Sequence, residues 1–235
     1  MSDQIQKKNP NESPSLDADK PASEMPLSEM RRDYHRGALR RENLPNCPFT
    51  FFRQWFEEAR SANIAEPNAM ILSTADASGF VLSRAVLLKA YDERGFVFFT
   101  NYHSRKAEHI AQNPNVSLLF PWFDLERQVI ICGKAEKIST AESIAYFMSR
   151  PFGSRIGAWV SQQSKVISTR ALLETKFHEL VQKFANGEVP KPDWWGGYRV
   201  CPTTIEFWQG GPNRIHDRFE YRKTPTGWEI VRLQP

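Results

Sequence analysis

The sequence predicts a mainly β protein, a β-barrel with helices on its flanks. Short apolar segments rich in β-branched and aromatic residues recur along the chain, and turn signals join several of them as hairpins. Helical segments interrupt these strands at only a few places. The regular strand–helix alternation of a doubly wound sheet is missing, and so is a GxGxxG turn.

Helices and strands follow one another without an internal repeat. The expected helices are residues 49–62, 104–112, 140–150 and 168–185, the third beginning with a capping box at Ser139 and Glu142. The expected strands are residues 69–74, 80–88, 95–100, 116–120, 128–133, 198–201, 204–208, 218–222 and 228–233. Residues 76–79 (DASG) predict a hairpin turn. Pro114 and Pro151 are expected to end the second and third helices.

Composition and charge describe an ordinary globular protein. The 235 residues are 40% hydrophobic and 25% charged, and the net charge of +4 is too small to name a polyanionic partner. Three cysteines lie far apart without metal-ligand spacing, which argues against a metal site and suits reduced thiols. Apolar stretches are too short for a membrane span, and we expect a cytoplasmic protein.

The N-terminal residues differ from the rest of the chain. Residues 1–27 are nearly free of large apolar side chains, so we expect a disordered tail, followed by one domain over residues 28–235. The domain begins with a basic stretch over residues 30–41. This stretch could be an anion-binding arm, but the pattern alone favours a solvated face.

The segment 207–218 is the most informative about chemistry. Arg214, His216 and Arg218 recur at every second residue, so in an extended strand their side chains would share one face. Such groups repel one another unless an anion or a carboxylate lies among them. Gly210 and Gly211 would let a ligand approach the backbone closely. The pattern is equally consistent with a ligand site and with a surface strand.

Two other patterns favour phosphate binding. Tyr146 and Arg150 lie four residues apart on one helix face, with Ser154 close behind, and these groups together can hold a phosphate ester. Arg105 and Lys106 open a short helix, where free backbone N–H groups also attract phosphate.

Several polar residues remain ambiguous. Arg84 and Lys89 bracket an apolar stretch, and their odd separation places them on opposite faces of an ideal strand. One ligand could meet both only if the strand bulges or if the ligand wraps around its end. Gln128, Gln163 and Ser164 could bond to the polar edge of a ring, but such residues are common. No GxSxG, HExxH or Walker motif supports a hydrolase, a zinc protease or a P-loop enzyme.

Eight ordered segments resemble the pyridoxine 5'-phosphate oxidase family, especially its bacterial members. They are residues 84–89 (RAVLLK), 99–101 (FTN) with 104–106 (SRK), 126–129 (ERQV), 146–151 (YFMSRP), 156–161 (IGAWVS) with 163–164 (QS), 189–192 (VPKP), 194–197 (WWGG), and 207–210 (FWQG) with 213–218 (NRIHDR). The resemblance runs over residues 30–235. It implies a split β-barrel, a homodimer with FMN at the subunit interface, and oxidation of pyridoxine or pyridoxamine 5'-phosphate by dioxygen to pyridoxal 5'-phosphate and hydrogen peroxide.

The resemblance also implies roles for single residues. The positions implied to contact FMN are Arg84, Lys89, Thr100, Arg105, Lys106, Gln128, Gln163, Ser164, Trp208 and Arg218. Those implied to hold the substrate phosphate are Lys89, Tyr146, Arg150 and Ser154. Arg214 and His216 are the implied catalytic residues over the substrate ring, and Arg31 and Tyr34 belong to an arm that closes over the site.

Two other functions stay open. Another split-barrel flavoprotein, such as a reductase that uses a nicotinamide or a deazaflavin, would share Arg105 and Lys106. It would have no reason to keep Arg214, His216 and the pair of Tyr146 with Arg150. A non-enzymatic protein that binds FMN or pyridoxal phosphate would show no oxygen uptake. Nucleic-acid binding is not expected, because the charge is modest and no known module is present.

Overall fold

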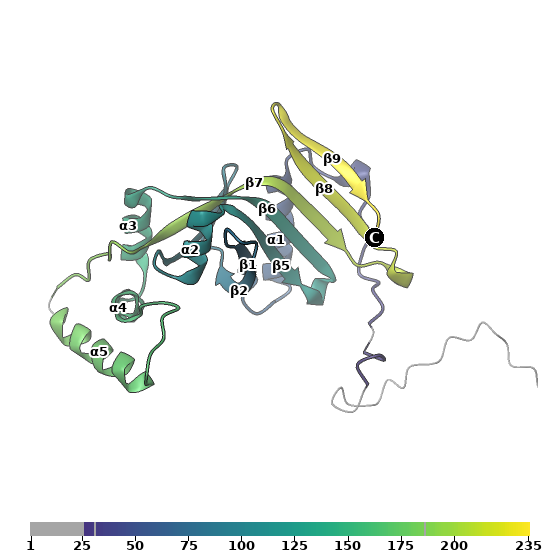
Figure 1. Cartoon of the computed structure of the whole chain (residues 1–235). Coiled ribbons are helices and arrows are strands. Elements are labelled where there is room, and N and C mark those ends of the chain that lie inside the picture. The colour runs from purple at the N-terminus through teal and green to yellow at the C-terminus, as the bar shows by residue number, and fades with distance from the viewer. Residues whose placement is uncertain (1–25, 31, 186) are drawn as a thin grey trace, which may run out of the picture. The chain divides into compact units, whose positions relative to one another are not determined.

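The structure is a computed structural model that describes residues 26–30, 32–185 and 187–235. The chain divides into two compact units, Met1–Asp33 and Tyr34–Pro235. In the first unit, the described residues form a short turn in which Pro26 O accepts a hydrogen bond from Glu29 N at 2.8 Å. The tail expected over residues 1–27 lies almost entirely outside the described residues. The second unit holds the sheet and its helices (Figure 1).

Nine strands in the described part of the chain form one sheet, and every pairing in it is antiparallel. The strands are β1 (Ala69–Ala75), β2 (Val81–Leu87), β3 (Ala90–Asp92), β4 (Gly95–Asn101), β5 (Asn115–Trp122), β6 (Arg127–Lys137), β7 (Trp195–Gln209), β8 (Asp217–Thr224) and β9 (Gly227–Leu233). Their order is β2-β1-β5-β6-β7-β4-β3, and β8 joins β7 to β9. The mainly β prediction is confirmed, and the residue 76–79 turn joins β1 to β2 with Gly79 at φ 86°.

Strand β7 organises the sheet, because its 15 residues are long enough to pair with three strands. It pairs with β6 along one edge, and along the other edge with β4 in its first half and with β8 in its second half. The two strands predicted over residues 198–201 and 204–208 are therefore one strand. The register with β6 shifts between Cys132, which pairs with Thr204, and Gly133, which pairs with Pro202, so a bulge at Thr203 lets the strand continue past the proline.

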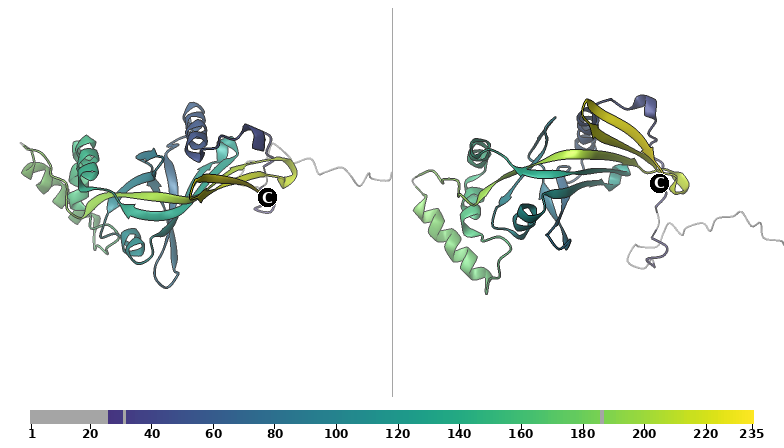
Figure 2. Two further views of the ribbon diagram at one scale, coloured as in Figure 1. Left: turned by 90° about the horizontal axis from the view of Figure 1, so that it is seen from above. Right: turned by 45° about the horizontal axis from the view of Figure 1, so that its top comes forward.

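The helices lie on the flanks of the sheet. They are α1 (Pro48–Ser61), α2 (Arg105–Gln112), α3 (Thr140–Ser149), α4 (Phe152–Val160) and α5 (Arg170–Lys183), with short 3₁₀ turns η2 (Arg41–Asn43), η3 (Phe123–Leu125) and η4 (Pro212–Arg214). Figures 1 and 2 show α3, α4 and α5 near the beginning of β7, and β8 and β9 near its end. Among the described residues, no helix combines the length and apolar character needed to span a membrane.

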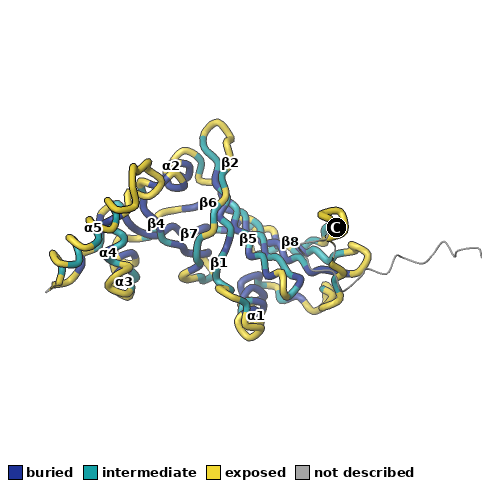
Figure 3. Tube along the Cα trace, turned by 90° about the horizontal axis from the view of Figure 1, so that it is seen from below, coloured by how far each residue is buried: buried dark blue, intermediate teal, exposed yellow. Residues whose placement is uncertain are grey.

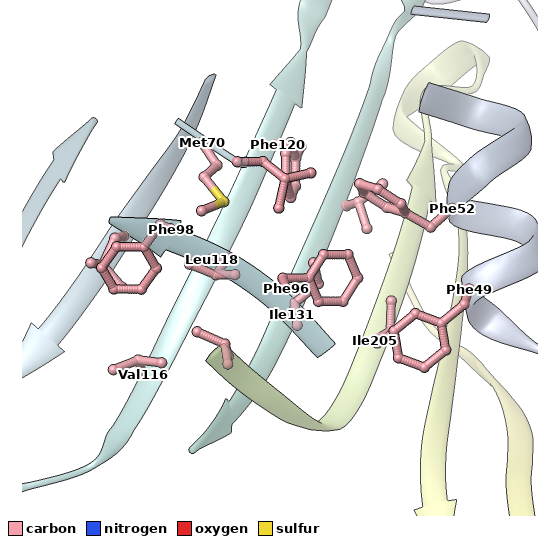
Figure 4. Packing of buried hydrophobic residues seen from close by; sticks show 14 of the residues in the cluster. Phe49, Phe52, Met70, Phe96, Phe98, Val116, Leu118, Phe120, Ile131 and Ile205 are labelled. Atoms are coloured by element: carbon pink, nitrogen blue, oxygen red, sulfur yellow. The ribbon is translucent and has the colours of Figure 1, made fainter. Parts of the chain in front are cut away.

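The main core lies between α1 and the sheet. Phe52 of α1 is fully buried and packs against Phe96 and Phe120, with ring centroids 4.9 and 5.1 Å away (Figure 4). The Trp122 ring lies 6.0 Å from it. The apolar side chains recur at helical spacing, and Pro48 starts the helix, where its missing N–H has no cost. Burial of these aromatic rings anchors α1 on the sheet.

A second, smaller cluster holds the helices near the beginning of β7. Phe147, Ile156 and Trp195 are its buried centre, and α5 covers it while remaining largely exposed (Figure 3). Helix α4 was not predicted from the sequence. Pro151 ends α3 as expected, but it also serves as the N-cap residue of α4, because proline is compatible with a helix start as well as with a helix end.

Candidate functional site

The residues expected to bind phosphate surround one cavity of about 830 Å³. β2, β4, α2, α3 and α4 contribute its walls. Five cations line it, and the described chain contributes no carboxylate to its lining: Arg84, Lys89, Arg105, Lys106 and Arg150. Thr100, Tyr146, Ser154, Gln163 and Ser164 complete the predicted set at the same cavity. We call this space the cationic cavity. Its positive charge would attract an anion.

Arg84 is fixed from behind by strand β1. Its guanidinium Nη1 donates to Thr74 Oγ1 at 2.7 Å and to Leu72 O at 3.1 Å. Burial, and then the charge of Arg105, lower the pKa of Arg84. Lys89 reaches the same cavity because β2 ends at Leu87, so Lys89 lies in the link to β3 and the alternation of an ideal strand does not apply to it.

Gln163 joins two of the predicted ligands. Its Oε1 accepts hydrogen bonds from Thr100 Oγ1 at 2.9 Å and from Lys106 Nζ at 2.8 Å. Lys106 is buried at the start of α2, and burial together with the neighbouring Arg84 lowers its pKa to about 8. A buried ammonium with a neutral partner gains from an anion close by.

Arg150 lies over an aromatic wall. Its guanidinium carbon is 4.8 Å from the ring centroid of Trp195, and Tyr146 stacks on Phe99 at 4.0 Å. Burial lowers the pKa of Arg150 and raises the pKa of Tyr146. Arg150 Nη1 is buried and has no hydrogen-bond partner among the described residues. Buried donors are normally paired, so this nitrogen has the geometry of a ligand-binding group.

The other predicted residues gather near the end of β7. Gln128, Trp208 and Arg218 are direct partners across β6, β7 and β8, and residues opposite one another in a sheet share a face. Arg218 forms an ion pair with Glu206, at 2.7 Å between Nε and Oε1. A carboxylate therefore already compensates the charge of Arg218.

Residues 214–218 do not form one extended strand, so the condition for a face shared by Arg214, His216 and Arg218 is not met. Arg214 ends the η4 turn, and both Asn213 and Arg214 have positive φ angles of 54° and 61°. β8 begins only at Asp217, so of Arg214, His216 and Arg218 only Arg218 lies in a strand. The chain turns after Gly211 instead of continuing as a strand. The alternation of side chains along a strand therefore cannot place Arg214 and His216 on the same face as Arg218.

His216 belongs to an aromatic cluster with Tyr34 and Trp208. The His216 ring lies 4.6 Å from Trp208 and 5.7 Å from Tyr34, and Tyr34 meets Trp208 edge to face at 5.7 Å. His216 Nδ1 accepts a hydrogen bond from Gly211 N at 3.1 Å. With Nδ1 accepting this bond, Nε2 is the ring nitrogen that can donate a hydrogen bond. Arg31 lies outside the described residues.

One chain does not bring the two groups of residues together. Trp195 at the beginning of β7 lines the cationic cavity, and Trp208 near its end belongs to the aromatic cluster. A strand rises about 3.3 Å per residue, so these two tryptophans lie roughly 40 Å apart along β7. Arg105 and Arg150 share the cavity, whereas Arg214 lies at the other end of the strand.

Two residues that matter to the site were not identified from the sequence. Thr74 holds Arg84, and Glu126 accepts two backbone hydrogen bonds beside Tyr34. Thr74 could not be recognised because it is one of many polar residues in strands. Glu126 carried a weak signal, since it begins one of the eight family-like segments, but its partners lie about 90 positions away in the sequence.

Two family models match the chain. Residues 56–184 match "Pyridoxamine 5'-phosphate oxidase", and residues 195–235 match "Pyridoxine 5'-phosphate oxidase C-terminal dimerisation region". The two regions share one sheet, because β7 of the second pairs with β4 and β6 of the first.

Relatives named pyridoxine/pyridoxamine 5'-phosphate oxidase are similar over most of this chain. The protein of Crocosphaera subtropica is 58% identical over 90% of this chain and all of its own length. The protein of Prochlorococcus marinus is 56% identical over 92% of this chain and 99% of its own length.

Solved structures are similar as well. PhzG from Burkholderia lata 383, in complex with tetrahydrophenazine-1-carboxylic acid, has a TM-score of 0.79 at 29% identity, covering 83% of this chain and 95% of its own. A pyridoxamine 5'-phosphate oxidase-related, FMN-binding protein from Nostoc punctiforme has a TM-score of 0.65 at 15% identity, covering 82% and 100%. That likeness supports the fold alone. From the matched models and the bacterial relatives together, the chain belongs to the pyridoxamine 5'-phosphate oxidase family.

Proposed function

We propose that this protein is an FMN-dependent oxidase that converts pyridoxine or pyridoxamine 5'-phosphate to pyridoxal 5'-phosphate with dioxygen. The observation that carries the proposal is the cationic cavity, in which five cations face one space without a carboxylate from the described chain. Two phosphate groups, one from FMN and one from the substrate, would compensate this charge. Identity of 56–58% over about nine tenths of the chain to oxidases of this name supports the same activity.

The residues at the cavity fit the phosphate group of FMN. Arg84, Arg105 and Lys106 converge there. Burial, and then the charge of Arg84, lower the pKa of Lys106, and an anion bound beside it would stabilise its ammonium form. Thr100 and Gln163 offer neutral hydrogen-bonding groups at the same wall. The chemistry that FMN supplies when bound is a two-electron oxidation at C4' of the substrate, with dioxygen as the final acceptor.

The substrate phosphate is assigned to the aromatic side of the cavity. Arg150 presents a buried nitrogen without a described partner, and Tyr146, Ser154 and Lys89 line the same space. A guanidinium binds phosphate oxygens in a bidentate fork, which fixes orientation as well as charge. These residues bind a part of the substrate that does not react, so their energy serves positioning.

The second group of residues completes the site from a partner subunit. Gln128, Trp208 and Arg218 are assigned to FMN, and Tyr34, Arg214 and His216 to the substrate, with Arg31 as a further member of the arm. Because the two groups are roughly 40 Å apart along β7, a homodimer is needed to bring them together. The C-terminal dimerisation region contains β8 and η4, which carry Arg218 and Arg214.

Within this site, His216 and Arg214 orient the substrate ring. His216 presents Nε2–H because Gly211 holds Nδ1, so it can donate a hydrogen bond to the substrate. Arg214 contributes a permanent positive charge on an exposed turn. Orientation of C4' toward the reactive face of the flavin can contribute several kcal/mol. We also propose that the chain from residue 28 onward works as a single oxidase domain, which the sheet shared by both family regions supports.

The activity is tested with the purified full-length protein. A flavin absorption spectrum, followed by addition of pyridoxine 5'-phosphate in air, should show oxygen uptake with formation of pyridoxal 5'-phosphate and hydrogen peroxide. A flavin-loaded protein that consumes no oxygen with either vitamer would instead be a binding protein. Oxidation of a nicotinamide cofactor in place of the vitamer would identify a reductase.

A further inference from the structure

Glu126 connects the first residues of the second unit to the sheet through hydrogen bonds. It lies at the turn between β5 and β6, where it is 5% exposed. Its Oε2 atom accepts hydrogen bonds from two consecutive backbone N–H groups, His35 at 2.8 Å and Arg36 at 2.9 Å. A carboxylate is a strong acceptor for backbone N–H groups. One side-chain oxygen thereby fixes the backbone that directly follows Tyr34.

The main chain of Glu126 is fixed as well. Its carbonyl oxygen accepts hydrogen bonds from Gly210 N at 2.7 Å and from Gln209 Nε2 at 3.2 Å. Its φ of 55° places it in the left-handed region, which closes the η3 turn. The carboxylate is thus held at a defined position beside the end of β7.

This arrangement determines where Tyr34 lies. A Cβ atom at Gly210 would be 2.7 Å from Tyr34 Cγ and 3.1 Å from Glu126 Cβ, so the tyrosine packs directly on the glycine backbone. From there its ring meets Trp208 and His216, each at a centroid distance of 5.7 Å. The buried carboxylate, the glycine and the aromatic cluster form one continuous set of contacts.

We propose that Glu126 is a positioning residue that holds Tyr34 against His216 and Trp208. The inference rests on the proposed function, in which Tyr34 and His216 bind the substrate. Loss of the carboxylate frees the backbone at His35 and Arg36. The effect stays local, because Leu39 N remains bonded to Asp217 Oδ2 at 2.9 Å.

Three substitutions at Glu126 distinguish the effect of side-chain length from the effect of charge. Glu126→Gln keeps an oxygen at the same distance, whereas Glu126→Asp keeps the charge but is one methylene too short, and aspartate tolerates positive φ. We expect Glu126→Asp and Glu126→Ala to raise KM for pyridoxine 5'-phosphate about tenfold, with kcat and FMN content near wild type. Glu126→Gln should remain within about threefold of the wild-type KM.

A second readout does not depend on activity. Trypsin cleavage after Arg36, followed by mass spectrometry of the FMN-loaded protein, should accelerate in the Asp and Ala variants and stay slow in the Gln variant. Glu58→Gln is the matched control, because Glu58 is an exposed carboxylate that pairs with the adjacent Arg127. It should change neither KM nor cleavage.

Coupling to Tyr34 completes the test. In a Tyr34→Ala background, Glu126→Ala should raise KM little further, since both changes remove the same contact. The inference is overturned if the Asp and Ala variants keep wild-type KM and cleavage, if the two changes are fully additive, or if the Gln and Asp variants lose FMN and kcat equally. Absence of oxidase activity in the wild type would contradict the proposed function. The cleavage pattern would still show whether Glu126 holds the backbone at His35 and Arg36.

Discussion

Single cations around the cavity are held in different ways. Arg84 donates to Thr74 and to Leu72 O, and Lys106 donates to Gln163. Arg150 instead rests on Trp195, with Nη1 lacking a described partner. Residues that already have partners contribute a preorganised charge, whereas Arg150 keeps a donor for the ligand.

Arg150→Ala should raise KM for pyridoxine 5'-phosphate more than it lowers kcat. The guanidinium is assigned to a phosphate that does not react, and one charge-assisted hydrogen-bonded contact is worth about 1.5–3 kcal/mol, or roughly 10- to 150-fold in KM. Steady-state kinetics on protein saturated with FMN measures the changes in KM and kcat separately. An unchanged KM would remove Arg150 from the substrate site.

Thr74→Val should weaken FMN binding although Thr74 is buried behind Arg84. Valine has nearly the same shape but cannot accept the hydrogen bond from Nη1, which costs about 1–2 kcal/mol, or roughly 5- to 30-fold in Kd. Quenching of flavin fluorescence measures the affinity, and Thr74→Ser should restore most of it. Equal FMN affinity in all three proteins would show that Thr74 does not position Arg84.

FMN affinity should depend on pH through Lys106. Its pKa is lowered to about 8, so the ammonium is present below that pH and is lost as pH rises through it. Binding of the phosphate should therefore be nearly constant from pH 6.5 to 7.5 and weaken above pH 8, by at most about tenfold per pH unit. Fluorescence titrations at several pH values measure this. Lys106→Met should bind more weakly and lose this dependence.

At the scale of elements, the pairing of β6 with β7 leaves no room for a side chain at Gly133. The register of the two strands shifts there, and a Cβ atom on Gly133 would lie 2.1 Å from Cys201 O. Because the obstacle is backbone rather than a flexible side chain, relief requires movement of the strand. The bulge lets β7 continue past Pro202 and so connects the two halves of the sheet.

Gly133→Ala should destabilise the protein by about 3 kcal/mol, the upper end of the usual cost of overpacking. Urea unfolding of the FMN-free protein measures the change in the free energy of unfolding. Gly157→Ala in α4 is the control, since a Cβ atom there meets no heavy atom within 4 Å, and it should be neutral or stabilising by up to about 1 kcal/mol. Equal stability of the two variants would mean that the bulge relaxes freely.

At the scale of the whole molecule, the proposed site is divided between the two ends of β7. The cationic cavity lies at one end and the aromatic cluster at the other, so each subunit would supply half of two sites. In the proposed homodimer, this division would make activity a property of the dimer.

Two variants that are each impaired at limiting substrate should therefore complement each other. Arg150→Ala changes the cavity, and Arg214→Ala should retain FMN but lose most turnover. In a heterodimer of the two, one site carries both changes and the other carries neither. Random mixing by co-expression should restore about a quarter of wild-type activity at limiting substrate, because half of the dimers are mixed and each has one intact site. No recovery would place both residues in one subunit's site.

The sequence by itself determined the β class, most element positions and the identity of the residues at the cavity. These follow from local chemistry: side-chain periodicity, caps, turn residues, and ordered segments shared with a family. It predicted the α3 capping box and the α2 start at Arg105, both of which the structure contains.

Only the tertiary structure decided what depends on distant partners. The two strands predicted over residues 198–201 and 204–208 are one strand, β7, because a bulge opposite Gly133 lets the strand continue past Pro202. Positive φ angles at Asn213 and Arg214 form a turn, so Arg214 and His216 lie outside the strand that holds Arg218. The tertiary structure brought Thr74 behind Arg84 and Glu126 beside Tyr34. Glu126 lies about 90 residues from His35 and Arg36, and Thr74 meets Arg84 through the pairing of β1 with β2. Neither spacing nor propensity records these contacts, because they form only when the sheet assembles around its core.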